Sequence, residues 1–368
     1  MNNIIEMTHS IGQSLWLDSI SRQMINSGKI ENLIKNGITG ITSNPTIFDK
    51  AIGESNIYDS SLIEYSKVSQ NTDEIFEKLA IEDIKSAAKL LRHIYEASNF
   101  NDGYVSIEVS PEYANDAELT IKQAERLWKK IDEPNVMIKV PGTENGMLAV
   151  KKLISLGINI NITLLFSVQQ YEKAAMAYLE GLTLYAKSGL GKTSSVCSVA
   201  SFFISRIDTA VDNLLDENSE LRGKIAISNA KIAYDKYKKI FDKNLYGGGS
   251  FFPLYSTGAK VQKPLWASTS VKNPSYDKNI YLDNLIGDET INTVPLETFN
   301  NFSDSGKPNN SLIEDVEIAY ENIKKLSRFG IDFEQVTSKL LQEGIKAFSD
   351  SYDALLKKID VKLSKLKN

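Results

Sequence analysis

Short strand-like segments alternate with helix-like segments along almost the whole chain, and this alternation constrains the fold more than any other feature of the sequence. Between the strand-like runs, apolar residues recur every three to four positions instead of every second one. Strands that alternate with helices are typical of βαβ units and a parallel sheet, and eight such units favour a closed barrel. The predicted strands cover residues 14–18, 37–43, 104–109, 136–140, 160–166, 194–201, 264–269 and 290–294.

The order of these segments predicts one domain over residues 1–368, a (β/α)8 TIM barrel with extra terminal helices. A glycine-rich and aromatic stretch at 244–263 is interpreted as a loop insertion before the seventh strand. The polar, turn-rich stretch at 297–311 is interpreted as a linker, so that C-terminal helices begin at about residue 311. Ser167 and Gln170 have the spacing of a capping box, which predicts a helix start after the fifth strand.

Composition and charge argue against several classes of protein. The net charge is −5 and no basic stripe stands out before the lysine-rich C-terminal segment, so a nucleic-acid partner is not expected. No apolar run approaches the length of a membrane span, no secretory signal is recognised, and the single cysteine cannot form an internal disulfide. We therefore expect a cytoplasmic protein. With two histidines and one cysteine, a zinc site is not expected either.

Polar residues occur at or near the carboxyl ends of several predicted strands. In a closed barrel those ends meet at one mouth, where barrel enzymes hold their active sites. Side chains alternate along a strand, so each polar residue faces away from its apolar neighbours. For any single polar residue, a structural role is nevertheless the more frequent one. The residues concerned are Asp18, Asn44, Glu108, Lys139, Asn161 and Thr163.

Lys139 is the most informative of these residues because it lies inside the apolar run 136–140. Lysines are almost never fully buried without a partner. Desolvation of a lysine frees its amine to attack a carbonyl carbon. A lysine in a cavity with carboxylates nearby for proton transfer is the equipment of a Schiff-base enzyme that acts on a keto sugar.

Two long segments carry a resemblance to a known family. "GITSNPTIF" at 40–48 and "VMIKVPGTENGMLAVKKL" at 136–153 resemble the two signature segments of transaldolases, and "GININITLLFS" at 157–167 also fits. Further matching stretches at 198–208 and 263–276 extend the resemblance over nearly the whole chain, which is similar to the longer-chain bacterial subgroup. The resemblance implies a (β/α)8 barrel that transfers a dihydroxyacetone unit between sugar phosphates in the pentose phosphate pathway. It implies no metal and no other cofactor.

The resemblance also implies roles for four catalytic residues. Lys139 would form an imine with the donor ketose phosphate, either sedoheptulose 7-phosphate or fructose 6-phosphate. Asp18 would carry the proton when the carbon–carbon bond breaks or forms. Glu108 would activate a water molecule that Thr163 helps to hold. We expect a bridging water, and no direct ion pair, between Lys139 and Glu108.

Further residues are implied to bind the substrate. Asn44 and Asn161 would hydrogen-bond the three-carbon unit, and Arg206 would bind the phosphate as a planar fork. Lys272 stands where many members of the family have a second phosphate-binding arginine, and it is assigned the same role. The supporting residues around the three-carbon unit are Thr42, Ser106 and Ser201. The partners expected are thus sugar phosphates, with a homo-oligomer left open.

Two alternative functions have to be weighed. The first is a related class I aldolase that releases free dihydroxyacetone, in which a glutamine and a tyrosine hold the water. The matching positions here are Glu108 and Phe203, which favours transaldolase. The second is a catalytically silent barrel that only binds a sugar phosphate or a protein, and the presence of Lys139, Asp18 and Glu108 argues against it.

Overall fold

A computed structural model, which describes residues 3–244 and 251–367, contains a closed barrel of eight parallel strands. Each strand pairs with its neighbours in sequence, and β8 closes the barrel against β1. The predicted (β/α)8 barrel is thereby confirmed. The strands are β1 (Gln13–Leu17), β2 (Ile38–Ile41), β3 (Val105–Glu108), β4 (Val136–Pro141), β5 (Ile160–Leu165), β6 (Ser198–Phe203), β7 (Lys263–Ala267) and β8 (Thr290–Val294).

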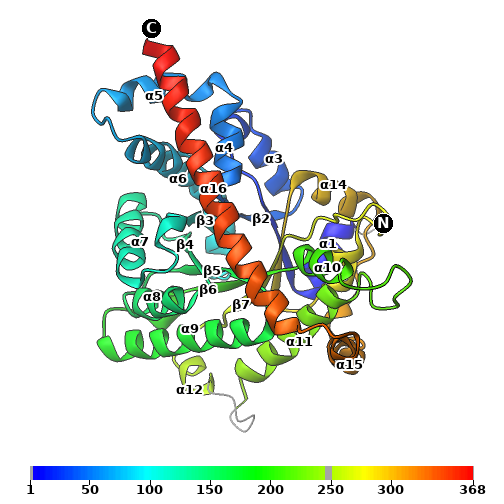
Figure 1. The fold of residues 1–368 in the computed structure, drawn as a ribbon. Coiled ribbons are helices and arrows are strands. Elements are labelled where there is room, and N and C mark those ends of the chain that lie inside the picture. Colours follow the sequence, from blue (N-terminus) through cyan, green and yellow to red (C-terminus); the bar gives the residue numbers. More distant parts are fainter. Residues whose placement is uncertain (1–2, 245–250, 368) are drawn as a thin grey trace.

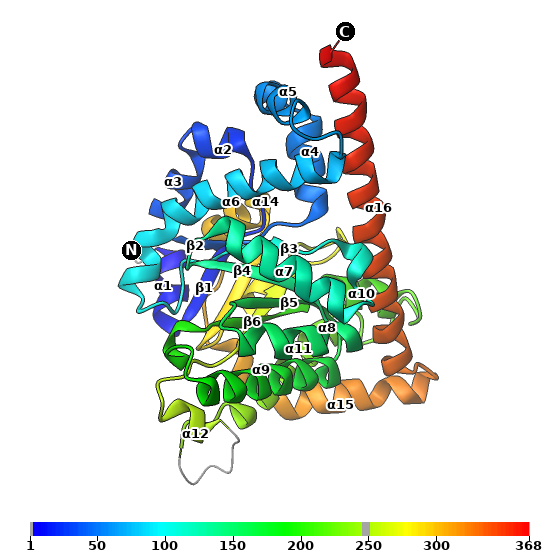
Figure 2. The same ribbon diagram turned by 90° about the vertical axis from the view of Figure 1, so that its left-hand side faces the viewer.

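Helices surround the barrel and cover one of its ends (Figures 1 and 2). Ser167 caps the helix after β5, and its capping box with Gln170 is formed as predicted. Within the described residues the helices are α1 (Ile4–Ile11), α2 (Arg22–Asn26), α3 (Lys29–Lys35), α4 (Pro45–Gly53), α5 (Asp59–Ser66), α6 (Thr72–Ala97), α7 (Ala117–Ile131), α8 (Glu144–Ser155), α9 (Val168–Ser188), α10 (Ser205–Asp212), α11 (Ile225–Ile240), α12 (Phe252–Tyr255), α13 (Ile280–Asn284), α14 (Leu296–Ser305), α15 (Val316–Leu326) and α16 (Phe333–Lys367).

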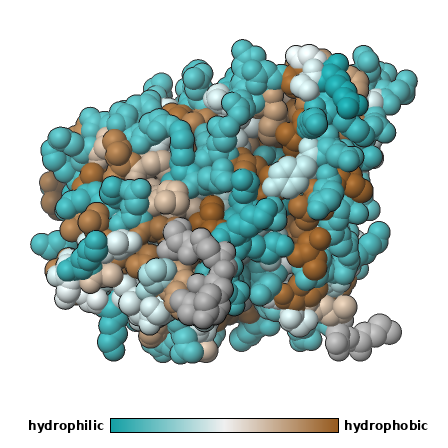
Figure 3. Space-filling view, turned by 90° about the horizontal axis from the view of Figure 1, so that it is seen from below, coloured by the Kyte–Doolittle hydropathy of each residue, from teal (hydrophilic) through white to brown (hydrophobic). Residues whose placement is uncertain are grey.

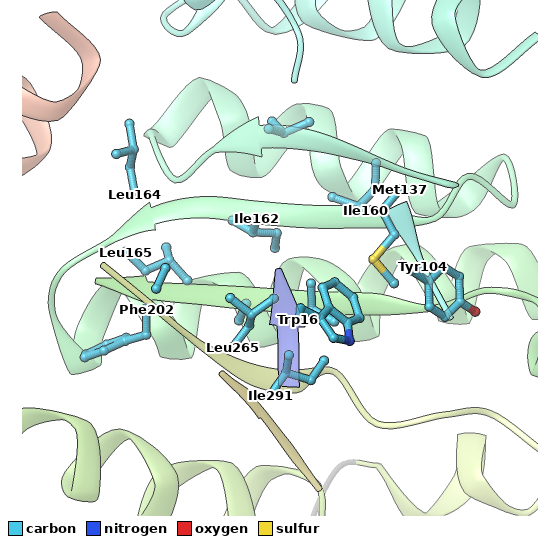
Figure 4. Packing of buried hydrophobic residues seen from close by; sticks show 14 of the residues in the cluster. Trp16, Tyr104, Met137, Ile160, Ile162, Leu164, Leu165, Phe202, Leu265 and Ile291 are labelled. Atoms are coloured by element: carbon cyan, nitrogen blue, oxygen red, sulfur yellow. The ribbon is translucent and has the colours of Figure 1, made fainter. Parts of the chain in front are cut away.

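Large side chains fill the barrel interior and leave polar residues for the mouth. Trp16 pairs with Gly40 on β2, where an added Cβ atom would lie 2.4 Å from the indole ring. The Trp16, Leu265 and Ile291 side chains lie together between the strands (Figure 4). All three are buried, and every residue of β4 and β5 is buried as well. This packing follows from strands that have helices on one side and the filled barrel on the other.

Only the eighth predicted strand, 290–294, has its predicted bounds in the structure, and the differences at the sixth and seventh strands have local causes. The sixth was predicted at 194–201 but begins at Ser198, because Thr193–Ser195 form a 3-10 turn. There the Ser195 hydroxyl donates to the Lys192 carbonyl, the kind of local hydrogen bond by which serine competes with strand pairing. The seventh was predicted at 264–269 but ends at Ala267, because Ser268 adopts a left-handed backbone with φ of 56°.

The C-terminal helix α16 lies across one end of the barrel (Figures 1 and 2). It contacts α4, α5, α6 and α10, which belong to different parts of the chain. Its buried residues recur every three or four positions, as expected of an amphipathic helix. These residues are Thr337, Leu340, Gly344, Phe348, Tyr352, Leu355, Ile359 and Leu363. The helix therefore presents a continuous buried stripe to the rest of the protein, and its other positions are mostly polar.

The predicted insertion at 244–263 is only partly described, since residues 245–250 lie outside the described ranges. Its second half contains α12, and Phe251 packs edge-on against Phe241 with ring centroids 5.3 Å apart. The predicted linker at 297–311 is wrong in its first part, because α14 occupies Leu296–Ser305. The predicted C-terminal helices then begin with a 3-10 turn at Ser311–Ile313, followed by α15 and α16.

The surface seen in Figure 3 is mostly polar, with apolar residues in separate groups among polar ones. In the parts of the chain that the structure describes, no helix combines the length and apolar character needed to span a membrane.

Candidate active site

Lys139 lies on β4 and its side chain is only 6% exposed. The ammonium Nζ atom donates to the backbone carbonyl of Ser43 at 3.0 Å and to Glu108 Oε2 at 3.4 Å. The Phe348 ring of α16 lies over the same ammonium group, 5.9 Å from Nζ to the ring centroid. A buried lysine thus has one carbonyl, one carboxylate and one aromatic face as neighbours.

The direct contact between Lys139 and Glu108 corrects the expectation of a bridging water. The two residues are Cα partners on neighbouring strands, and both side chains point into the same buried space. Burial removes the solvent that would otherwise separate the charges, so the ammonium group approaches one carboxylate oxygen directly. The other oxygen, Glu108 Oε1, remains available for a different partner.

Glu108 Oε1 and Thr163 Oγ1 are both buried, and neither has a hydrogen-bond partner within residues 3–244 and 251–367. Buried polar atoms are nearly always hydrogen-bonded, so both atoms are suited to a ligand or a bound water. Burial also raises the pKa of the Glu108 carboxyl above its ordinary value, while the charge of Lys139 acts in the opposite direction. Glu108 therefore has the environment of an acid–base group.

Asp18 directly follows β1 and is held between three strand ends. Its backbone N–H donates to the Val294 carbonyl at 2.8 Å, and its Oδ1 accepts from the Thr42 hydroxyl at 2.7 Å. Burial raises the pKa of the Asp18 carboxyl, whereas the charge of Lys139 and the Thr42 hydrogen bond act to lower it. A second carboxyl group with an altered affinity for protons thus lies within the electrostatic reach of Lys139.

A row of polar side chains crosses the barrel from β3 to β6. Lys139 pairs in register with Glu108 on one side and with Asn161 on the other. Asn161 donates from Nδ2 to Ser106 Oγ at 3.1 Å and accepts at Oδ1 from Ser201 at 2.6 Å. All three of these polar side chains are buried, so the Asn161 amide is held firmly next to Lys139.

Asn44 is placed differently from Asn161, because it is the N-cap of α4. Its Oδ1 accepts from the backbone N–H of Ile47 at 3.0 Å. The neighbouring Ser43 supplies the carbonyl that Lys139 contacts, so the segment that leads into α4 also borders the lysine. Capping therefore directs the amide oxygen of Asn44 toward its own helix.

Arg206 lies in the first turn of α10, directly after β6, and is half-buried. Its guanidinium stacks over the Phe203 ring at 5.4 Å, and burial lowers its pKa while the charge of Glu343 on α16 opposes that change. Lys272, in contrast, is exposed and donates to Ser270 Oγ at 3.0 Å. Of the two predicted phosphate ligands, Arg206 is therefore the one that is partly buried within the fold.

Three features of the site were missed in the sequence. The first is the Ser43 carbonyl, since backbone acceptors leave no trace in residue type. The second is Phe348, which lies more than 200 positions after Lys139 in the chain. The third is Leu164, whose φ of 61° accompanies a register shift between β5 and β6 directly after Thr163. Such bulges reorient neighbouring side chains, and they occur often next to active sites.

No group of three or more His, Cys, Asp or Glu side chains suited to a metal ion occurs among residues 3–244 and 251–367. Lys139, Glu108 and Asp18 support amine and carboxylate chemistry.

An eight-stranded barrel with a buried lysine that contacts one carboxyl group and acts electrostatically on a second is typical of Schiff-base barrel enzymes. Residues 15–359 match the family Transaldolase/Fructose-6-phosphate aldolase, and the chain belongs to this family. A transaldolase of Trichodesmium erythraeum (strain IMS101) is 42% identical over 99% of this chain and 98% of its own length. "Transaldolase 2" of Nostoc sp. (strain PCC 7120) is 42% identical over 100% and 99%, and a transaldolase of Thiobacillus denitrificans is 42% identical over 97% and 99%.

The hydrogen bonds of Asp208, a buried residue of α10, provide a test of the structure around Arg206. Asp208 is buried on α10, accepts from the Ala226 N–H at 2.8 Å and from the Tyr281 hydroxyl at 3.0 Å, and has Asp212 nearby. Burial raises the pKa of Asp208 to about 7. The folded state therefore binds this proton more tightly than the unfolded state, and the resulting stability is lost as the pH rises from about 4 through about 7.

We predict that the melting temperature of the wild type falls relative to that of Asp208→Asn between pH 4 and 7, and that the difference levels off above that range. The control is Asp216→Asn, at an exposed position shortly after α10. Its melting temperature is expected to follow that of the wild type over the whole pH range. A constant difference between wild type and Asp208→Asn over this range would contradict the prediction.

Proposed function

We propose that this chain is a transaldolase, which transfers a dihydroxyacetone unit from fructose 6-phosphate or sedoheptulose 7-phosphate to an aldose phosphate through a Schiff base on Lys139. The observation that carries the proposal is the burial of Lys139 in contact with Glu108 and within reach of Asp18. Family membership and curated relatives named transaldolase support the same reaction.

The first half of the reaction forms the imine. The neutral Lys139 amine attacks the C2 carbonyl of the ketose, the carbonyl oxygen takes up a proton, and water leaves as the C=N bond forms. Glu108 is assigned the proton transfers because Oε2 already contacts Lys139 Nζ at 3.4 Å. Its other oxygen and Thr163 Oγ1, both buried and without partners in the described parts of the chain, are suited to hold the water that leaves and later returns.

The second half breaks the carbon–carbon bond. Asp18 takes the proton from the C4 hydroxyl, the C3–C4 bond breaks, and its electrons pass into the imine to give an enamine on Lys139. The aldose phosphate formed from C4 onward leaves. An acceptor aldose phosphate then reacts in reverse, and Asp18 returns the proton to the new hydroxyl. The imine supplies the electron sink, so the proposal includes no metal or other cofactor.

The neighbours of Lys139 suit the three-carbon unit that stays attached. Asn161 is held by Ser106 and Ser201, and the Thr42 hydroxyl contacts Asp18. These groups offer donors and acceptors for the hydroxyls of dihydroxyacetone, with Asn44 as a further candidate at the start of α4. The proposal assigns the substrate phosphate to Arg206 and gives Lys272 an auxiliary role at the exposed rim.

The proposal extends to the setting of the reaction. We infer that the whole chain acts as one domain, in the cytoplasm and in the pentose phosphate pathway, with sugar phosphates as its ligands. A related aldolase activity is less well supported, because Glu108 stands where that group has a glutamine and Phe203 where it has a tyrosine.

Product analysis separates these two activities. With fructose 6-phosphate and erythrose 4-phosphate, we predict glyceraldehyde 3-phosphate and sedoheptulose 7-phosphate in equal amounts. Without an acceptor, release of glyceraldehyde 3-phosphate stops after about one equivalent per active site, because the enamine on Lys139 has no aldehyde to attack. Continued release of free dihydroxyacetone without an acceptor would show that the enzyme is an aldolase.

The role of Arg206 is tested by comparing donors. Loss of a charge-assisted hydrogen bond costs about 1.5–3 kcal/mol, so Arg206→Ala is expected to lower kcat/KM for fructose 6-phosphate by roughly ten- to a hundredfold. Turnover of unphosphorylated fructose should change little. Lys272→Ala is expected to have a smaller effect, and Arg328→Ala, at an exposed position, is the control. Equal losses with both donors would mean that Arg206 does not contact the phosphate.

A further inference from the structure

Thr293 on β8 makes a hydrogen bond that the reaction as described does not use. Its hydroxyl lies 2.6 Å from the Thr42 hydroxyl, and Thr42 in turn donates to Asp18 Oδ1 at 2.7 Å. Both threonines are buried. Two hydroxyl groups in series therefore connect the last strand of the barrel with the carboxyl group at the end of the first.

The strand ends around Asp18 hold these two hydrogen bonds in place. The Asp18 N–H donates to the Val294 carbonyl, and the Thr42 N–H donates to the Leu17 carbonyl at 2.9 Å. Side chains alternate along β8, so Thr293 faces the same way as Ile291, which packs with Trp16 and Leu265 inside the barrel (Figure 4). Thr293 is thus the interior side chain of β8 nearest the mouth.

The direction of the two hydrogen bonds follows from the charge of Asp18. An ionised carboxylate only accepts, so the single hydroxyl hydrogen of Thr42 points to Asp18. The Thr42 oxygen can then only accept from Thr293, and Thr293 must donate. When Asp18 is protonated this constraint disappears. The arrangement with both hydrogens directed toward Asp18 consequently belongs to the ionised carboxylate.

We propose that Thr293 is a positioning residue, whose hydroxyl holds the Thr42 hydroxyl in the orientation that donates to Asp18. A valine would fill the same space, so packing alone does not require a threonine at this position. Hydrogen bonds in series strengthen one another inside a protein, and the effect favours the ionised form of Asp18. The proposal rests on the proposed function in giving Asp18 the proton transfer at the carbon–carbon bond.

Two charged groups also act on Asp18, and a substitution at Thr293 leaves both of them in the protein. Lys139 on β4 favours the ionised carboxylate, and Glu108 on β3 repels it, as seen in the effect of the Asp18 charge on the pKa of Glu108. Both groups belong to the imine chemistry. A change at Thr293 should therefore affect the carbon–carbon step and leave imine formation unchanged.

The test compares the two steps in Thr293→Val. The burst of glyceraldehyde 3-phosphate released from fructose 6-phosphate reports carbon–carbon cleavage, and borohydride trapping reports the imine at Lys139. We expect the acidic limb of the cleavage rate to move to higher pH by about half a unit, because Asp18 holds its proton more tightly. The amount of trapped imine should equal that of the wild type.

Thr293→Ser retains the hydroxyl and should give the wild-type pH profile of the cleavage rate. Thr293→Ala removes the hydroxyl without introducing the valine side chain, and it should show the same shift of the acidic limb as Thr293→Val. An unshifted limb in both Thr293→Val and Thr293→Ala, or an equal loss of rate at every pH, would overturn the role given to Thr293. Absence of a trapped imine at Lys139 in the wild type would instead overturn the proposed function and, with it, this extension.

Discussion

A lysine side chain inside a barrel must find partners within the protein, because an unpaired buried charge is strongly unfavourable. Lys139 is satisfied by the Ser43 carbonyl and by Glu108, which come from the segment before α4 and from β3. Each partner is in turn constrained: Ser43 Oγ donates to the Ser106 carbonyl, and Glu108 pairs in register with the lysine itself. The site is therefore assembled only when β2, β3 and β4 are in register at the mouth.

The helix α16 completes this environment from the opposite end of the sequence. Phe348 covers the Lys139 ammonium group, and Gly344 allows close approach to Leu164 and Arg206, since an added Cβ atom would lie 2.9 Å from Leu164 Cδ2. The side chain of Leu164, a residue with left-handed backbone, is thus packed against a glycine of α16. Exclusion of water by this helix strengthens the electrostatic interactions among Lys139 and the carboxyl groups.

Much of this architecture could be predicted from local pattern. Apolar residues switch between a spacing of two and a spacing of three to four, and this switch indicated the eight strands. Ser167 with Gln170 marked the start of α9. Errors arose where local hydrogen bonds or backbone conformation override strand propensity, as at Thr193–Ser195 and Ser268. Contacts that depend on register or on distant segments could not be derived, namely the direct approach of Glu108 to Lys139 and the position of Phe348. A single sequence contains no distances between strands.

A Schiff base on Lys139 is tested most directly by mass spectrometry of peptides after borohydride reduction in the presence of fructose 6-phosphate. We predict that a reduced three-carbon unit is attached to Lys139 and to no other lysine, because this lysine is the one buried beside Glu108 and within reach of Asp18. Lys139→Arg should abolish the label, since a guanidinium remains protonated and cannot attack a carbonyl. A label on another lysine, or normal turnover by Lys139→Arg, would contradict a catalytic Schiff base on Lys139.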